Sequence, residues 1–155
     1  MVAHSQPQLN HLLYEQDFYL WIQTTAKLLK EHRFQEVDLE NLIEEIESMG
    51  RSEKKELKSR LIVLIEHLLK LIYWEAEKAY NARGWRDTIV EQRRQIDFSL
   101  EDSPSLRPLL TDLFLDSYQK ARSDALRKYQ LPADFFPTEP PFTLEDVFNP
   151  DYLPE

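Results

Sequence analysis

Arg60 and His67 are the two residues whose types and spacing best suggest chemistry. They are seven residues apart, so on one helix their side chains share a face at roughly 10 Å axial separation. A histidine can move protons near neutral pH, and an arginine can hold a phosphate with two hydrogen bonds. The pair is therefore the candidate catalytic set. The alternative is structural: Arg60 pairs with Glu56, and His67 bonds an acid of a neighbouring helix.

The same spacing resembles the signature of the HEPN ribonucleases, helical enzymes with an arginine and a histidine separated by six residues. Leu61 follows the arginine here, where that family usually has a polar residue. The resemblance implies a metal-independent protein that cleaves or binds RNA. Trp74 and Lys78 continue this flank of the helix, where they could stack on bases or bind a phosphate backbone. The candidate ligand-binding residues are Lys70, Trp74, Lys78 and Arg93.

A second candidate is a metal site made of carboxylates and a histidine. Helical bundles hold such sites, but the di-iron class needs a Glu-x-x-His spacing, which is not found in this sequence. The chain has no cysteine, so disulfides and thiolate metal sites are excluded. We therefore expect no metal and no cofactor. The residues that would supply a metal site are Glu45, Glu47, His67 and Glu75.

The composition favours long helices over sheets. Only two of the 155 residues are glycines, and six of the nine prolines lie at or after Pro132. A β-sandwich or a βαβ fold needs more turn residues than this. We expect an all-α fold: an antiparallel bundle of four to five helices around a long central helix, with a Pro-rich extended C-terminal segment.

The central helix is predicted over residues 52–81, because its apolar residues recur on one stripe. Gly50 is expected just after the preceding helix, at its C′ position. Glu75 falls within the stripe, so it is either exposed to solvent near the helix end or buried beside a cation. The other helices are predicted over 13 or 17–31, 39–49, 85–100 and 103–129, with a short turn at 143–148. The expected N-caps are Asp17, Asp38, Ser52, Ser103 and Thr143. The stripe consists of Leu57, Leu61, Leu64, Ile65, Leu68, Ile72 and Ala79.

The length fits one domain, residues 1–155. Within it, residues 1–12 are expected to be flexible. Residues 131–155 are expected to form an extended tail packed on the bundle, because they carry seven large apolar side chains.

The net charge of −9 is unevenly distributed. Residues 36–50 and 131–155 each hold six acids and no bases, whereas residues 51–94 hold eleven bases against seven acids. The whole acidic molecule repels a polyanion at long range, so we do not expect duplex nucleic acid as a partner. The acidic and basic segments predict either a docking surface for a protein or internal pairs. Such pairs would join Arg60 or Arg93 to Glu45 or Glu47.

No basic segment followed by an apolar one starts the sequence, so we expect no signal peptide. The longest apolar run, residues 61–74, is interrupted by Glu66, His67 and Lys70, and is too short and too charged to span a bilayer. These patterns predict a cytoplasmic protein without a membrane partner.

Several short segments, in this order, resemble a known family, Domain of Unknown Function twenty-nine. The resemblance covers residues 14–153 and implies a helical fold and a bacterial cytoplasmic protein of a family abundant in cyanobacteria. It implies no activity and no site residue. The segments are 14–18 (YEQDF), 41–46 (NLIEEI), 49–54 (MGRSEK), 67–70 (HLLK), 103–106 (SPSL) and the Pro-rich aromatic tail.

The sequence contains no glycine-rich phosphate loop and no Ser–His–Asp arrangement. We therefore expect a small non-catalytic protein that acts through protein–protein contacts, with a protein partner or as a homodimer. The RNA-directed protein using Arg60 and His67, and the carboxylate–histidine metal protein, remain the alternatives.

Overall fold

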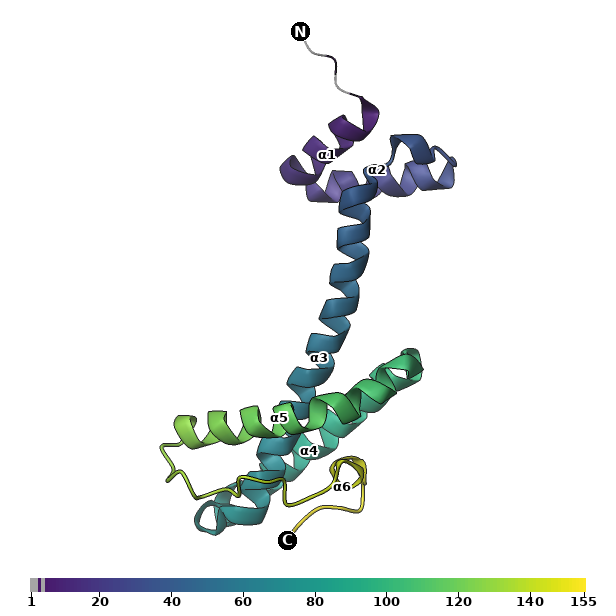
Figure 1. Ribbon diagram of the computed structural model, residues 1–155. Helices are drawn as coiled ribbons and strands as arrows, with labels where there is room; N and C mark the ends of the chain where they lie inside the picture. The colour runs from purple at the N-terminus through teal and green to yellow at the C-terminus, as the bar shows by residue number, and fades with distance from the viewer. Residues whose placement is uncertain (1–2, 4) are drawn as a thin grey trace. The chain divides into compact units, whose positions relative to one another are not determined.

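The computed structural model describes residue 3 and residues 5–155. Over this part of the chain it contains six α-helices, two short 3-10 helices and no strand (Figure 1). The prediction of an all-α bundle is therefore confirmed, with six helices where four to five were predicted. The chain divides into two compact units, Met1–Ser52 and Glu53–Glu155, where the sequence predicted one domain. The first is the N-terminal unit and the second is the C-terminal unit.

The N-terminal unit contains α1 (Gln6–Gln16), α2 (Phe18–Lys30), the 3-10 helix η1 (Phe34–Glu36) and the first part of α3. Helix α2 matches the first predicted helix, whose start was given as residue 13 or 17. The sequence prediction missed α1, which begins at Gln6. Its start is stabilised by a capping box between Ser5 and Gln8, with Pro7 in the first turn. Asp17 caps α2 as predicted, and its carboxylate accepts the N–H of Leu20 at 3.0 Å. Of the segment expected to be flexible, residues 1, 2 and 4 lie outside the described residues.

Helix α3 (Leu39–Tyr73) runs without interruption through Gly50, so the predicted helix end there is wrong. Asp38 caps its start as predicted, accepting the N–H of Asn41. Gly50 does not adopt a positive φ. A glycine inside a helix costs only about 0.5–1 kcal/mol, which the flanking helical turns readily offset.

The predicted central helix over residues 52–81 is also interrupted, because the chain breaks at Trp74 before α4 (Glu75–Asp102). The Trp74 ring lies 4.9 Å from that of Tyr129 and 6.1 Å from that of Trp85, centroid to centroid. These contacts hold the half-buried Trp74 ring against the core at the turn. Glu75 is consequently the first residue of α4 and is exposed, which decides between the two alternatives for this residue.

The C-terminal unit packs the second part of α3 against α4 and α5 (Arg107–Lys128) (Figure 1). The predicted helix over 85–100 is part of α4. The Ser103–Pro104 start signal opens the 3-10 helix η2 (Pro104–Leu106) rather than α5 itself. The stripe predicted on the central helix is buried at Leu57, Leu61, Leu64, Ile65 and Leu68, whereas Ala79 lies beyond the break and is exposed.

The C-terminal segment, residues 131–155, contributes three side chains to this core: Phe136, Phe142 and Val147 are 0%, 5% and 0% exposed. It includes one short helix, α6 (Leu144–Phe148), which Thr143 caps as predicted by accepting the N–H of Asp146. Among the helices of the described residues, none is both long and apolar enough to cross a membrane.

Candidate functional site

A buried lysine, Lys70, lies at the centre of a polar and aromatic cluster in the C-terminal unit. It is 3% exposed, and its Nζ lies 3.6 Å from a carboxylate oxygen of Glu66, one turn earlier on α3. The same Nζ donates to the hydroxyl of Tyr129 at 3.2 Å. It also lies 5.4 Å and 5.1 Å from the ring centroids of Trp85 and Tyr129, which is cation–π distance. The Lys70 cluster, as we call it, consists of Glu66, His67, Lys70, Trp85 and Tyr129.

His67, a candidate catalytic residue, belongs to the Lys70 cluster. Its Nδ1 lies 2.7 Å from the carbonyl oxygen of Val63, and its Nε2 lies 3.5 Å from Nζ of Lys70. Burial, together with the charge of Lys70, lowers the pKa of His67 below its ordinary value of 6.5. The structural alternative predicted a bond to an acid of a neighbouring helix. The ring instead bonds the backbone and a lysine of its own helix.

Arg60, the other candidate catalytic residue, pairs with Glu56 as the structural alternative predicted. Its Nε and Nη2 donate to one carboxylate oxygen of Glu56 at 3.1 and 3.0 Å, and Nη1 lies 3.4 Å from the side-chain oxygen of Gln92. The guanidinium therefore has partners on its own helix and on α4. A joint role of Arg60 and His67 in RNA cleavage stays a hypothesis.

Two of the candidate ligand-binding residues, Trp74 and Lys78, are used in packing and in contacts within the chain. The Trp74 ring is half-buried against Trp85 and Tyr129. Lys78 pairs with Glu75 at 2.9 Å and donates to the carbonyl oxygen of Glu155.

Arg93, the remaining ligand-binding candidate, holds the C-terminal segment against α4. It is 6% exposed and donates to the carbonyl oxygens of Val147 and Tyr152, both at 2.8 Å, and to that of Asp146 at 3.3 Å. These bonds use Nε and Nη2, whereas Nη1 is buried without a hydrogen-bond partner among the described residues. A pairing of Arg93 with Glu45 or Glu47 stays a hypothesis. Burial without a carboxylate partner lowers the pKa of Arg93.

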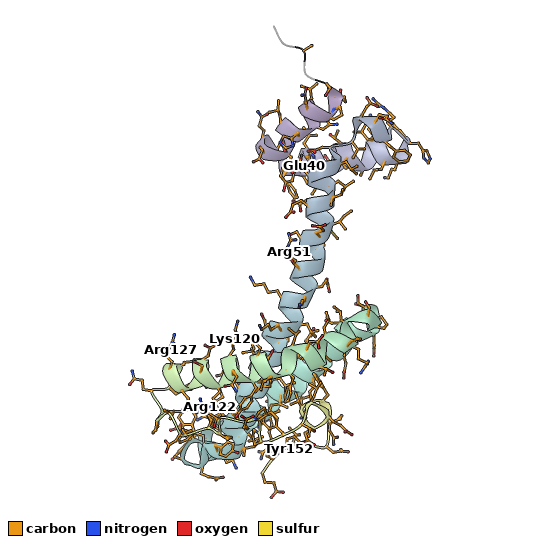
Figure 2. The ribbon with its side chains drawn as sticks, in the orientation of Figure 1. Glu40, Arg51, Lys120, Arg122, Arg127 and Tyr152 are labelled. Carbon is orange, nitrogen blue, oxygen red and sulfur yellow. The ribbon has the colours of Figure 1, made fainter. Side chains whose placement is uncertain are left out.

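Helix α5 binds the same segment in the same way. Arg122 donates to the carbonyl oxygens of Phe136, at 3.0 Å, and Ala133, at 2.5 Å, and Figure 2 shows Arg122 on α5 with Tyr152 in the C-terminal segment. Backbone carbonyls are present whatever the side chains of the segment are. These two arginines therefore hold the C-terminal segment against α4 and α5 whatever its side chains are.

The candidate metal ligands have separate partners. Glu45 accepts from the hydroxyl of Tyr14 at 2.6 Å, which raises the pKa of Tyr14 to about 12. A carboxylate oxygen of Glu47 lies 4.0 Å from Nη1 of Arg51. The other two, His67 and Glu75, belong to the contacts described above. Within the described residues, no three His, Cys, Asp or Glu side chains are grouped so that they could hold a metal ion.

The most distinctive surface is in the N-terminal unit, where α2 and the start of α3 leave large apolar side chains uncovered. They line a groove of about 280 Å³ between the two helices. Leu39 and Ile43 extend the exposed stripe along α3, at helical spacing from Ile46. We call the exposed residues lining this groove the apolar face; they are Phe18, Ile22, Leu29, Ile46 and Met49, each 37–67% exposed.

Burial differs sharply between the two units. Of the 16 exposed large hydrophobic side chains in the described residues, 12 lie between Leu9 and Met49. Among its described residues, the same unit buries three apolar side chains, those of Trp21, Leu28 and Val37, whereas the C-terminal unit buries 20. The N-terminal unit therefore has far more uncovered apolar surface than core.

The helical spacing of these apolar residues can be seen in the sequence, but the predicted bundle places such residues in its interior. A periodic pattern shows which side chains are apolar, and does not show whether another helix covers them. One available signal is that Tyr19 and Leu20 lie outside the stripe of α2, which makes that helix apolar on more than one side.

Together these features describe an all-α protein with a well-packed C-terminal unit and an uncovered apolar face in its N-terminal unit. The family model named Domain of unknown function DUF29 matches residues 13–153. The chain therefore belongs to this family, whose description assigns no activity. Neither the curated proteins nor the solved structures include a significant match to this chain.

Proposed function

We propose that this protein is non-catalytic and acts through protein–protein contacts made by the apolar face. The observation that carries the proposal is the excess of exposed over buried apolar side chains in the described residues of the N-terminal unit, 12 against three, together with the five exposed ones that line a single groove. Contiguous apolar patches of this kind mark interaction surfaces in water-soluble proteins. We further propose that it works in the bacterial cytoplasm, as the family resemblance suggests.

Energetics also support a partner for the N-terminal unit. A unit of about 50 residues is close to the lower size limit for independent stability, and usually gains its remaining stability from oligomerisation, metals or disulfides. The chain has no cysteine, which leaves no disulfide to play this part. A bound protein surface that covers Ile46 and Met49 would extend the small core around Trp21 and Leu28.

The chemistry of the surroundings favours a protein over a polyanion as the partner. The N-terminal unit carries nine acids and four Lys or Arg residues. Figure 2 shows Glu40 and Arg51 on α3, and Arg51 is bonded to Glu44 at 2.7 Å. An apolar groove with an acidic surround repels nucleic acid and accepts an apolar protein surface.

The test is site-specific photo-crosslinking of the full chain in extract of its native cells. A photoreactive amino acid at Ile46 should cross-link to one defined protein, either a different protein or a second copy of this chain. The matched control is the same amino acid at Leu115, an exposed apolar residue of α5 that is not part of the face. Equal labelling at both positions, or none at either, would refute the proposal.

A further inference from the structure

We propose that the partner of the apolar face is the same face of a second copy, so that two N-terminal units form a two-fold symmetric four-helix layer. This inference rests on the proposed function and specifies its partner. The face spans two neighbouring helices, α2 and the start of α3, with a groove between them. A two-fold axis passing beside the groove would set a helix of each copy over the groove of the other.

The charges of the two helices are complementary across such a symmetry axis. Helix α2 carries Lys27 and Lys30 and no acid. The first part of α3, residues 39–50, carries four glutamates and no base. In a symmetric interface each α2 can lie beside the partner's α3. The favourable contact between a basic and an acidic helix then occurs twice in the dimer. Pairing α3 with α3 would instead bring glutamates together.

The arrangement also supplies the core that the N-terminal unit lacks. Each copy would bury its five face residues, against three apolar side chains buried at present. In a symmetric dimer each face residue is buried twice, once in each copy.

The first measurement is the mass of the full-length protein in solution by light scattering and sedimentation, over a concentration series. We expect a dimer. Ile46→Glu places a charge in the proposed interface and should weaken dimerisation at least thirty-fold, the effect of losing a residue worth about 2 kcal/mol. Leu115→Glu adds the same charge to an exposed apolar position of α5 and should leave the dimer intact. Circular dichroism verifies that both variants remain helical.

The second measurement tests the pairing of α2 with the partner's α3. Because the natural chain has no cysteine, single cysteines can be introduced without background. A mixture of Ile22→Cys and Ile46→Cys chains should form mixed disulfide dimers under mild oxidation faster than either variant alone. Preferential Ile46–Ile46 linkage would overturn the proposed arrangement.

Three outcomes separate this inference from the proposed function. A monomer at every concentration whose Ile46 position still cross-links to a different protein overturns the homodimer and leaves the proposed function standing. A dimer that Ile46→Glu does not weaken overturns the inference, because the copies then meet elsewhere. A monomer without a specific cross-link at Ile46 overturns both.

Discussion

His67 and Lys70 meet with the ring nitrogen Nε2 3.5 Å from the ammonium Nζ. Nδ1 of the ring lies 2.7 Å from the carbonyl oxygen of Val63. A carbonyl can only accept, so we assign the ring proton to Nδ1, which leaves Nε2 to accept from Lys70. A second proton on the ring would place two cations in contact inside the C-terminal unit. The geometry therefore favours a neutral His67 with both ring nitrogens bonded.

The first prediction is that acid destabilises the protein through His67. The pKa of His67 is below 6.5 in the folded chain and close to 6.5 in the unfolded chain. As the pH falls through 6.5, the unfolded state takes up the proton first, so the free energy of unfolding decreases until the folded pKa is reached. Above this window His67 adds no pH dependence. Urea unfolding across the window should show the decrease.

The control is His67→Gln, which replaces the imidazole by an amide that can also donate and accept hydrogen bonds but does not titrate. Its free energy of unfolding should change less with pH over the same window. Identical pH profiles for the two proteins would show that His67 does not have the lowered pKa described here.

The second prediction concerns the cation itself. Lys70→Ala removes a buried partner of Glu66 and the cation over Trp85 and Tyr129. Breaking a largely buried pair leaves a carboxylate uncompensated, so we expect a loss of about 2–4 kcal/mol in the free energy of unfolding. Lys128→Ala is the comparison, because its Nζ also lies 5.1 Å from the Tyr129 ring centroid but the side chain is exposed. The Lys128→Ala variant should lose no more than about 0.5 kcal/mol in its free energy of unfolding. Similar losses in the two variants would show that burial of Lys70 does not increase its contribution to stability.

The core of the C-terminal unit was predictable from the sequence. Leu57, Leu61, Leu64, Ile65 and Leu68 are buried because a strong 3.6-residue period specifies which face of a helix turns inward. The caps at Asp17, Asp38 and Thr143 were predictable for a similar reason. A short acceptor side chain at that position satisfies amides that the helix leaves free.

The helix ends at Gly50 and Asn81 were predicted wrongly, because long-range packing competes with local signals. Trp74 breaks the helix where its ring meets Trp85 and Tyr129, and Tyr129 lies 55 residues further along the chain. Burial of Lys70 depends on the same aromatic residues. Helical periodicity carries no information about such partners, so neither the break nor the Lys70 cluster could be derived from it.

The third prediction tests the continuity of α3 at Gly50. A Cβ added there meets nothing within 4 Å, and the residue does not adopt a positive φ. Gly50→Ala should therefore raise the free energy of unfolding by about 0.5–1 kcal/mol, through better helix propensity and a less flexible unfolded chain. Gly84→Ala in α4 has the same open surroundings and serves as the matched variant. If Gly50→Ala destabilises while Gly84→Ala stabilises, the helix is broken at residue 50.

The fourth prediction concerns Arg93 and the C-terminal segment. Arg93→Met keeps much of the length and apolar character of the side chain but removes the donors to Val147, Asp146 and Tyr152. Hydrogen bonds from a charged donor are worth about 1.5–3 kcal/mol each, and part of this is recovered when water reaches the freed carbonyls. We expect a loss of about 2–4 kcal/mol, measured by urea unfolding. Amide hydrogen exchange should accelerate over residues 143–153.

The neighbouring Arg94 provides the control for this last prediction. Its exposed guanidinium pairs with Glu91 three residues earlier and forms no hydrogen bond or ion pair with the described C-terminal segment. Arg94→Met should change the free energy of unfolding by less than about 0.5 kcal/mol and leave hydrogen exchange in the segment unchanged. Accelerated exchange in both variants would point to the loss of positive charge on α4 as the cause. Acceleration in Arg93→Met alone would identify the three carbonyl bonds, since that is where the two arginines differ most.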